Sequence, residues 1–438
     1  MAVSQITCDT HIGITMKALS NFILNSKNVS KSTFIWNMVA AMSNSFQSML
    51  LMLIITRSGN VTEASYIAIG FSIANLMMTI GKFGMRNYQV TDIKEKSSFS
   101  EYLYSRNITV ITMTVCSVIY LAYSIFGKNY SFVKAVVVAL ICVYKIIESY
   151  EDVFHSRLQQ IGRLDIASKI WAIRNCIFIL MFFGLYLATG NIVMTVGIDV
   201  AVSFLLFVTL NVIPKEYYEK SKVNTKNVVS LLKGCIPIFV AAFLLMYISN
   251  APKYIIDSAI TDEEQTIFNI LFLTIYVVTL LSNFVFNPVI NKLAVMRAAK
   301  ENKNLIGNIN RLLAMVIGIV VLGIAFAQLI GRKILGMIYD VSLEDYKKEL
   351  ILMLISGGFL AIINLLYMVI IMLRKQNIFL AVFSIASMIL FVFGKNILKS
   401  YHLKGLCFFY GGILSAIVIV LYIVSIYYIN QGKEISND

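Results

Sequence analysis

The stretch of sequence that decides the fold is a long apolar run followed by a short polar segment. Residues 228–249 read VVSLLKGCIPIFVAAFLLMYIS, and residues 250–257 continue as NAPKYIID. The apolar run contains one charged residue, Lys233. About 20 mostly apolar residues are enough for one helix to cross the hydrocarbon core of a bilayer. The sequence therefore predicts a transmembrane helix with polar residues at one end.

The composition extends this prediction to the whole chain. Of the 438 residues, 58% are hydrophobic and 14% are charged, and the mean hydropathy is +0.79. A water-soluble domain of this length does not have such a composition, and continuous apolarity without alternation excludes a closed β-barrel. We expect an all-α polytopic membrane protein with about twelve transmembrane helices. The predicted spans lie near Thr33–Thr56, Thr62–Met85, Asn107–Phe126, Tyr130–Tyr150, Asp165–Thr189, Asn191–Ile213, Val228–Ser249, Gln265–Val289, Ile309–Leu329, Lys348–Met368, Asn377–Ile397 and Gly405–Tyr428.

A polar stretch divides these spans into two groups of six. This pattern predicts two six-helix lobes around a central cavity, and an even number of spans in each half means that both lobes enter the membrane from the same side. The lysine-rich connection from Pro214 to Lys233 is the expected hinge. The predicted domains are an N-terminal segment 1–32, a lobe 33–213, a linker 214–227, a lobe 228–428 and a tail 429–438.

Charge in the loops predicts the orientation of the chain. Lys and Arg crowd alternate loops, including the segments Lys82–Arg106, Lys145–Arg174 and Lys292–Arg311. Cytoplasmic loops have this excess of basic residues, so both termini are predicted to be cytoplasmic. The net charge of +14 then reflects topology and contact with anionic membrane lipid, and no nucleic-acid partner is expected. The first 30 or so residues lack the apolar core of a cleaved signal peptide.

The polar segment after the apolar run predicts a functional face. On a helix, Asn250, Tyr254 and Asp257 share one side, and Lys253 and Asp257 stand one turn apart, close enough to pair. Charged residues at membrane depth are expected to face a protein cavity. The alternative is a water-exposed helix end that bends at Pro252.

Charged residues in the fourth and fifth spans form a second predicted group. Lys145, Glu148 and Asp152 follow i, i+3 and i+7 at the inner end of the fourth span, and Arg174 lies well inside the fifth. A guanidinium at that depth needs a carboxylate, carbonyl groups or an anionic ligand, and its planar fork suits phosphate. The alternative is an internal pair with Glu148 or Asp152.

Three more cations and one carboxylate complete the predicted sites. Three cations lie at the inner ends of spans: Lys82, Arg86 and Lys233. They either form a positively charged entrance that attracts an anionic head group or act as ordinary interface anchors. Asp199 has no cation nearby in sequence, so it is either a proton or sodium site or a structural carboxylate. The six cysteines and three histidines are dispersed, so no metal, redox or other cofactor site is expected.

Several short motifs together resemble a known family. They are Asn37 and Gln47 in the first span, Phe83–Val90 (FGMRNYQV) after the second, Glu151–Phe154 (EDVF) after the fourth, and Asn250–Asp257 at the seventh. With these motifs and its twelve-span plan, the chain resembles, over nearly its whole length, bacterial polysaccharide flippases of the O-antigen and teichoic-acid-exporter type. These belong to the multidrug/oligosaccharidyl-lipid/polysaccharide exporter superfamily.

The resemblance implies a flippase of the bacterial plasma membrane that moves an undecaprenyl-pyrophosphate-linked oligosaccharide from the inner to the outer leaflet by alternating access. The transported glycan would serve the biosynthesis of a surface polysaccharide such as O-antigen, capsule or exopolysaccharide. Arg86, Arg174 and Lys233 would hold the pyrophosphate. The expected substrate-binding residues are Arg86, Asn87, Lys145, Arg174, Lys233, Asn250, Lys253, Tyr254 and Asp257, and the expected ion-coupling residues are Glu148, Asp152 and Asp199. No nucleotide-binding loop is present, so the energy is expected to come from an H⁺ or Na⁺ gradient or from consumption of the product outside. A polysaccharide polymerase is a further partner that the resemblance implies.

Three alternatives stay open on the sequence alone. An ion-coupled drug or cation antiporter of the same superfamily would favour acidic cavity residues, whereas the deep charges here lean basic. A polysaccharide polymerase would be an enzyme with a large outer loop, which this chain lacks. A non-transporting membrane scaffold or receptor subunit would not explain why Arg174 and the polar residues of Asn250–Asp257 lie in or next to membrane spans. The sequence therefore favours a transporter without enzymatic activity.

Overall fold

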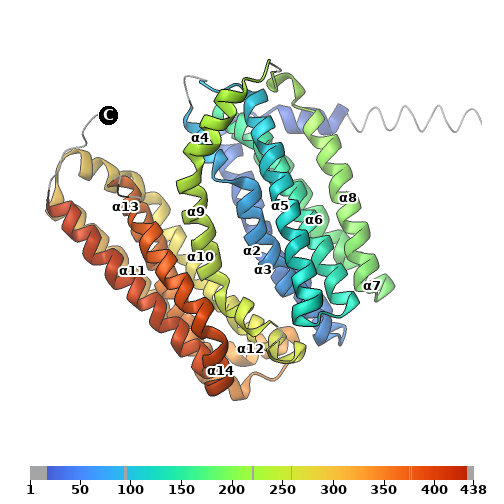
Figure 1. Cartoon of the computed structure of the whole chain (residues 1–438), viewed down its shortest axis with the longest axis vertical. Coiled ribbons are helices and arrows are strands. Elements are labelled where there is room, and N and C mark those ends of the chain that lie inside the picture. Colours follow the sequence, from blue (N-terminus) through green and yellow to red (C-terminus); the bar gives the residue numbers. More distant parts are fainter. Residues whose placement is uncertain are drawn as a thin grey trace, which may run out of the picture. The chain divides into compact units, whose positions relative to one another are not determined.

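The computed structural model describes residues 17–92, 96–219, 221–257, 259–373, 375 and 377–431. Within these ranges every regular element is a helix (Figure 1), which confirms the predicted all-α fold. The α-helices are α2 Val29–Arg57, α3 Val61–Lys82, α4 Met85–Thr91, α5 Phe99–Lys128, α6 Phe132–Gln160, α7 Leu164–Thr189, α8 Ile192–Val212, α9 Thr225–Ile256, α10 Asp262–Ala298, α11 Asn302–Phe326, α12 Arg332–Tyr339, α13 Lys347–Met372 and α14 Asn377–Asn430. Two short 3₁₀ helices are η1 Lys215–Tyr217 and η3 Glu344–Tyr346, and η2 Ala327–Gly331 is a short π-helix.

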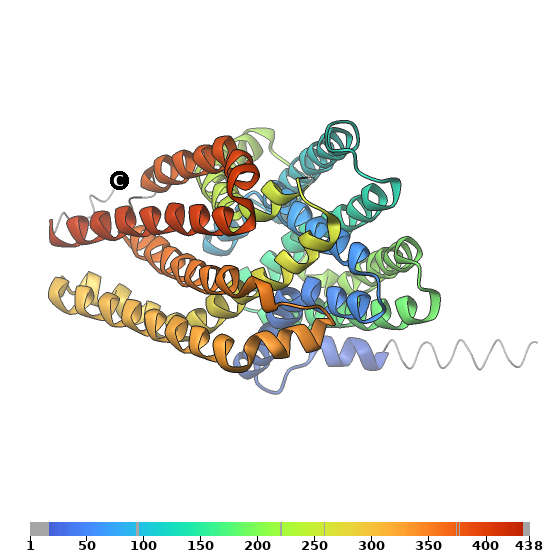
Figure 2. The same cartoon turned by 90° about the horizontal axis from the view of Figure 1, so that it is seen from below.

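The helices agree with a multi-pass membrane protein. Ten helices of the described part are long and apolar enough to cross a membrane. One of them, α14, holds two helices, because His402 interrupts it with a non-helical backbone (φ 54°, ψ −163°). Figure 2 shows the two red segments of α14 on either side of this break. α6 is 29 residues long but lies outside the ten, since charged residues occupy its second half. Counting α6 and both parts of α14, the described helices match the twelve predicted spans.

The chain divides into two compact units. The first unit comprises the residues up to Ile54 and Ile73–Phe239, and the second comprises Ile55–Ser72 and the residues from Val240 onward. The division therefore falls inside α9, which is helical through both Pro237 and Pro252. The lobe limits predicted from the sequence stay a prediction.

The linker 214–227 lies against the first unit. Arg163 Nη1 donates a hydrogen bond to the Tyr217 hydroxyl (2.9 Å), and the Asn224 backbone N–H donates to Glu101 Oε1 (3.1 Å). The side-chain hydrogen bond from Arg163 to Asp165 raises the pKa of this arginine, so the guanidinium stays charged. Both ends of the linker are thus attached to the first unit.

In each unit one helix is surrounded by the others. α4, α5, α7 and α8 pack on α6 in the first unit (Figure 1), and α10, α11 and α14 pack on α13 in the second (Figure 2). A surrounded helix must bury its polar side chains as well as its apolar ones, and buried charges need partners. This position of α6 decides what its charged residues can contact.

A glycine turn brings α4 onto α6. Gly84 has a φ of 66°, a left-handed conformation that glycine adopts without strain. A Cβ at this position would lie 2.7 Å from Ile238 Cγ2 of the same unit, so a side chain would also collide with a neighbour. The turn allows Arg86, two residues later, to reach α6.

The N-terminal segment predicted as 1–32 is described from residue 17, and residues 1–16 lie outside the described part. Residues 17–24 form a helix whose Ile23 is buried against Leu158 and Ile170. The Lys169 ammonium donates to the Phe22 carbonyl (2.7 Å) at the end of this helix, where cations are favourable. Of the predicted tail, residues 432–438 lie outside the described part.

Candidate functional site

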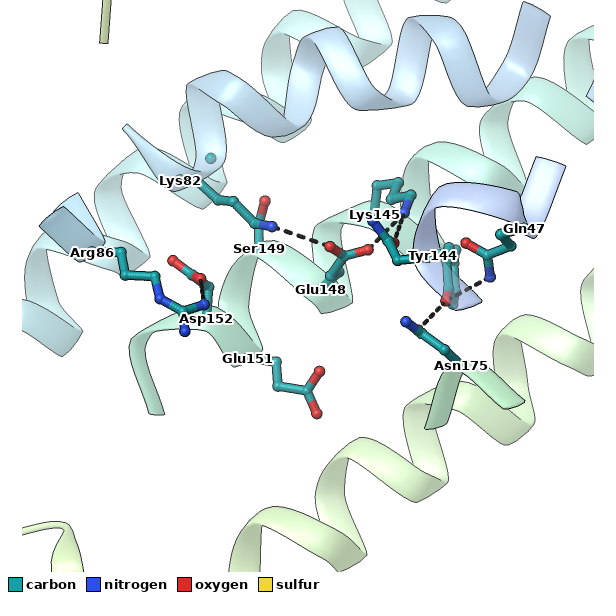
Figure 3. Close-up of polar contacts among 12 residues, drawn as sticks. Gln47, Lys82, Arg86, Tyr144, Lys145, Glu148, Ser149, Glu151, Asp152 and Asn175 are labelled. Atoms are coloured by element: carbon teal, nitrogen blue, oxygen red, sulfur yellow. Dashed lines mark hydrogen bonds and ion pairs between the residues drawn. The ribbon is translucent and has the colours of Figure 1, made fainter. Parts of the chain in front are cut away.

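Successive turns of α6 carry a row of buried charged and polar residues. Lys145, Glu148, Glu151, Asp152 and His155 are each at most 5% exposed. Figure 3 shows the side chains from Lys145 to Asp152 as they extend toward neighbouring helices. Because an unpaired charge in a protein interior is very unfavourable, the partners of this row define the site.

Glu148 lies between two lysines. Its Oε2 is 2.6 Å from the Lys145 ammonium, and its Oε1 is 3.1 Å from the Lys82 ammonium, as Figure 3 shows. Lys145 also donates to Asn44 Oδ1 on α2 (3.2 Å). The Lys82 side chain is 31% exposed, whereas that of Lys145 is buried. Lys145 and Glu148 therefore form an ion pair on α6, with Lys82 at its accessible edge. The functional role predicted for this helix face stays a prediction.

Asp152 lies between two arginines. Its Oδ2 is 2.9 Å from Arg106 Nη2, and its Oδ1 is 3.2 Å from Arg86 Nη1. The Arg106 side chain is fully buried, whereas that of Arg86 is 34% exposed. Arg86 also donates from Nε and Nη2 to Gln159 Oε1, at 2.9 and 2.7 Å. Arg106 is a site residue that the sequence pattern does not reveal, because it falls at the end of a basic loop, where arginine usually serves as an interface anchor.

Arg174 forms an internal ion pair, and its partner is Glu151. Glu151 Oε2 is 2.9 Å from Arg174 Nε and 2.8 Å from Nη2, while Nη1 donates to Ser203 Oγ (3.1 Å). The other oxygen of Glu151 accepts from Asn211 Nδ2 (3.0 Å). The guanidinium also lies over the ring of Tyr144, 5.4 Å from its centroid.

This pairing corrects the sequence prediction, which named Glu148 or Asp152 as the internal partner of Arg174. The reason is the helical period: Glu148 and Asp152 face α3, α4 and α5, whereas Glu151 is directed toward α7 and α8. The fully buried, multiply bonded guanidinium favours the internal pair over a phosphate-binding role for Arg174.

We call this group the α6 network. Its cations are Lys82, Arg86, Arg106, Lys145 and Arg174, and its carboxylates are Glu148, Glu151 and Asp152. Five cations against three carboxylates leave an excess of two positive charges when His155 is neutral. Only Lys82 and Arg86 have side chains about one third exposed. The excess positive charge is therefore accessible at these two residues.

Gln47, which belongs to the motif in the first span, joins the same region. Its Nε2 donates to the Tyr144 hydroxyl (2.8 Å), and that hydroxyl donates to Asn175 Oδ1 (3.1 Å), as drawn in Figure 3. The rings of Tyr144 and Phe178 lie 4.1 Å apart. These contacts orient the aromatic face on which Arg174 rests.

In the second unit, Lys253 is buried without a carboxylate partner among the described residues. Its ammonium lies 4.6 Å from the centroid of Phe272 and 5.1 Å from that of Tyr276, and it donates to the Tyr276 hydroxyl (3.4 Å). That hydroxyl donates to Asn250 Oδ1 (2.9 Å). The predicted pair of Lys253 with Asp257 is wrong. A spacing of one helical turn allows the two side chains to meet, but the ammonium is directed to the aromatic residues of α10.

We expect Lys253→Met to leave the stability unchanged or to increase it, because methionine has a similar length and removes a buried charge that no carboxylate compensates. The measurement is the thermal unfolding temperature of the purified protein in detergent. Phe272→Met, which replaces one of the aromatic contacts of the ammonium, serves as the matched variant and should lower that temperature. A large loss of stability in Lys253→Met would show that the ammonium makes a stabilising contact that the described residues do not include.

Four other predicted residues are not members of the α6 network as defined above. The Tyr254 hydroxyl donates to the Ser72 carbonyl of the same unit (2.8 Å). Asp199 on α8 is fully buried, and neither carboxylate oxygen has a hydrogen-bond partner in the described part. Asn87 and Lys233 are exposed. Within the described ranges no three His, Cys, Asp or Glu side chains lie together in a way that could hold a metal ion.

Known proteins are similar to this chain in structure only. No family model matches the sequence, and no curated protein matches it. The lipid II flippase MurJ in an inward closed conformation has a TM-score of 0.65 and 15% identity, over 92% of this chain and 89% of that chain. A MOP superfamily transporter from Pyrococcus furiosus, described as having a binding pocket of reversed polarity, has a TM-score of 0.61 and 14% identity, over 95% and 99%. A multidrug resistance MATE family transporter of the MOP superfamily has a TM-score of 0.59 and 14% identity, over 95% and 99%.

These comparisons define the class of fold. The chain has the all-α, multi-pass membrane fold seen in transporters of the MOP superfamily and in the flippase MurJ. At identities of 14–15%, they establish the fold alone, and the substrate has to be argued from the side chains.

Proposed function

We propose that this protein is a transporter that moves an undecaprenyl-pyrophosphate-linked oligosaccharide from the inner to the outer leaflet of a bacterial plasma membrane by alternating access. In this proposal both termini are cytoplasmic, and the transported glycan enters the biosynthesis of a surface polysaccharide. The observation that carries the proposal is the excess positive charge of the α6 network, accessible at Lys82 and Arg86.

A pyrophosphate suits these two residues for reasons of charge and geometry. Glu148 takes one of the three N–H donors of Lys82, and Asp152 and Gln159 take donors of Arg86, so each cation keeps donors for a ligand. The same contacts hold the two side chains in place before a ligand arrives, which reduces the entropy lost on binding. Charged hydrogen bonds to a phosphate are about twice as strong as neutral ones.

The test is flipping of a lipid-linked oligosaccharide in proteoliposomes that contain the purified protein. We expect the double variant Lys82→Ala, Arg86→Ala to slow the appearance of glycan on the opposite leaflet at least tenfold, because a charged hydrogen bond contributes about 1.5–3 kcal/mol. Lys395→Ala, which removes an exposed cation from α14, is the control and should retain the normal rate. An unchanged rate in a correctly folded double variant would contradict the proposed role of both residues.

Asp199 supports coupling of transport to an ion. Ion coupling also fits a second candidate function, a drug or cation antiporter. Glu148 and Asp152 are each held by two cations, whereas the described residues provide Asp199 with no partner. We therefore propose Asp199 as the site for H⁺ or Na⁺. An ion-coupled drug or cation antiporter would need the same kind of group. Export of a cationic dye that is lost in Asp199→Asn, without any flipping of a pyrophosphate-linked glycan, would support the antiporter instead.

A further inference from the structure

The first unit contains an apolar cavity whose lining does not include Lys82 or Arg86. It has a volume of about 360 Å³ and lies between α5 and α8, with α6 behind it. Its walls include the rings of Phe99, Phe154, Phe207 and Tyr218, and its polar residues include Asn211 and Lys215. A cavity of this size with mostly apolar walls and a few polar groups is typical of a ligand site.

The aromatic walls hold one another in place. The rings of Phe99 and Tyr218 are stacked with centroids 5.3 Å apart, Phe154 meets Tyr218 edge-on at 5.0 Å, and Phe154 and Phe207 lie 6.3 Å apart. Aromatic pairs at such separations are favourable beyond the area they bury. The cavity is therefore a preformed slot with rigid sides.

The surroundings of the slot indicate where its occupant comes from. On α8, Phe204, Leu205, Val208 and Val212 are 43–61% exposed, and in a membrane-spanning chain such a helix surface contacts lipid. Val208 and Val212 also line the slot, so it lies directly beside this lipid-facing surface. Lys215, which follows α8, is exposed and also lines the slot.

We propose that the slot binds an anionic phospholipid of the surrounding membrane, with one acyl chain between the aromatic rings and the phosphate at Lys215. The apolar walls match a hydrocarbon chain, and the single lysine at the end of the slot matches a negatively charged head group. The proposal is independent of the transported substrate, since it concerns a resident lipid.

The bound lipid would connect two parts of the first unit. Tyr218 belongs to the linker 214–227, and Asn211 donates to Glu151, the partner of Arg174. A chain in the slot would contact both residues and fill the space between the linker and α8. The lipid would thereby stabilise the linker on the first unit.

The test is binding of phosphatidylglycerol to the delipidated protein in detergent, measured by native mass spectrometry. We expect Val208→Trp, which fills the slot, to weaken binding at least tenfold. Leu205→Trp is the matched control, because Leu205 lies on the same helix and is exposed but does not line the slot. Equal thermal unfolding temperatures of the two variants establish that both are folded. Equal binding of phosphatidylglycerol by both would overturn the site.

The role of the head group is tested separately. Lys215→Ala should weaken phosphatidylglycerol binding about fivefold, since a lysine near an anionic surface contributes about 1 kcal/mol. Binding of phosphatidylcholine should be weaker in the unaltered protein and insensitive to Lys215→Ala. If phosphatidylcholine binds as tightly as phosphatidylglycerol, the proposed selectivity for an anionic lipid is wrong.

Discussion

Arg174→Ala is expected to destabilise the protein by about 3–5 kcal/mol, because it leaves Glu151 as an uncompensated charge in the interior. Glu151 is buried, and its other contact, from Asn211 Nδ2, cannot neutralise it. The measurement is the shift in the unfolding midpoint of the purified protein in detergent. Leu180→Ala on the same helix α7 is the control, since Leu180 is 71% exposed, and should change the stability far less.

A double variant separates the ion pair from the packing of the arginine. In Arg174→Met, Glu151→Gln the glutamine keeps an oxygen for Asn211 and carries no charge, so we expect most of the lost stability to return. If Arg174 instead held the pyrophosphate, as the family resemblance implies, Arg174→Ala would insert normally and lose transport through lost phosphate binding. A single variant that is fully stable but inactive would restore that role and contradict the internal pair.

Asp152→Asn is expected to have an effect of similar size, about 3–5 kcal/mol, because it removes the charge that compensates a fully buried arginine. Arg106 Nη2 lies 2.9 Å from the carboxylate, and the asparagine keeps the shape of the side chain but not its charge. Arg86 loses the same partner, although its exposure and its contact with Gln159 reduce the consequence. The unfolding midpoint is again the measurement.

Two comparisons make this second prediction specific. Glu216→Gln removes an exposed carboxylate from η1 of the same unit, and surface substitutions of this kind usually change stability by less than about 0.5 kcal/mol. Arg106→Met combined with Asp152→Asn should recover part of the loss, because only the accessible Arg86 then lacks its carboxylate. If Asp152→Asn is as stable as Glu216→Gln, the Arg106 pair does not contribute to stability.

Both predictions have the same consequence for function. The deepest cations, Arg106 and Arg174, are engaged in holding α5, α6 and α7 together, so substitutions there affect folding before they affect transport. The accessible cations, Lys82 and Arg86, can be removed with a smaller expected loss of stability. Transport experiments are therefore most informative on these two residues.

The sequence by itself determined the class of fold and most helix positions. Each apolar run of about 20 residues is matched to the bilayer on its own, so the prediction needs no knowledge of neighbouring helices. The charged second half of α6 makes it the least apolar of the spans. Its charges are accommodated only because α3, α4, α5, α7 and α8 supply their partners.

The partners of the buried charges were decided by the tertiary structure. Periodicity places Glu148, Glu151 and Asp152 around one helix, but it does not say which neighbouring helix lies on each side. The pairing of Glu151 with Arg174, the burial of Arg106 and the aromatic contacts of Lys253 all depend on those neighbours. A spacing of one turn predicts that two side chains can meet, whereas the packed helices decide whether a stronger partner lies within reach.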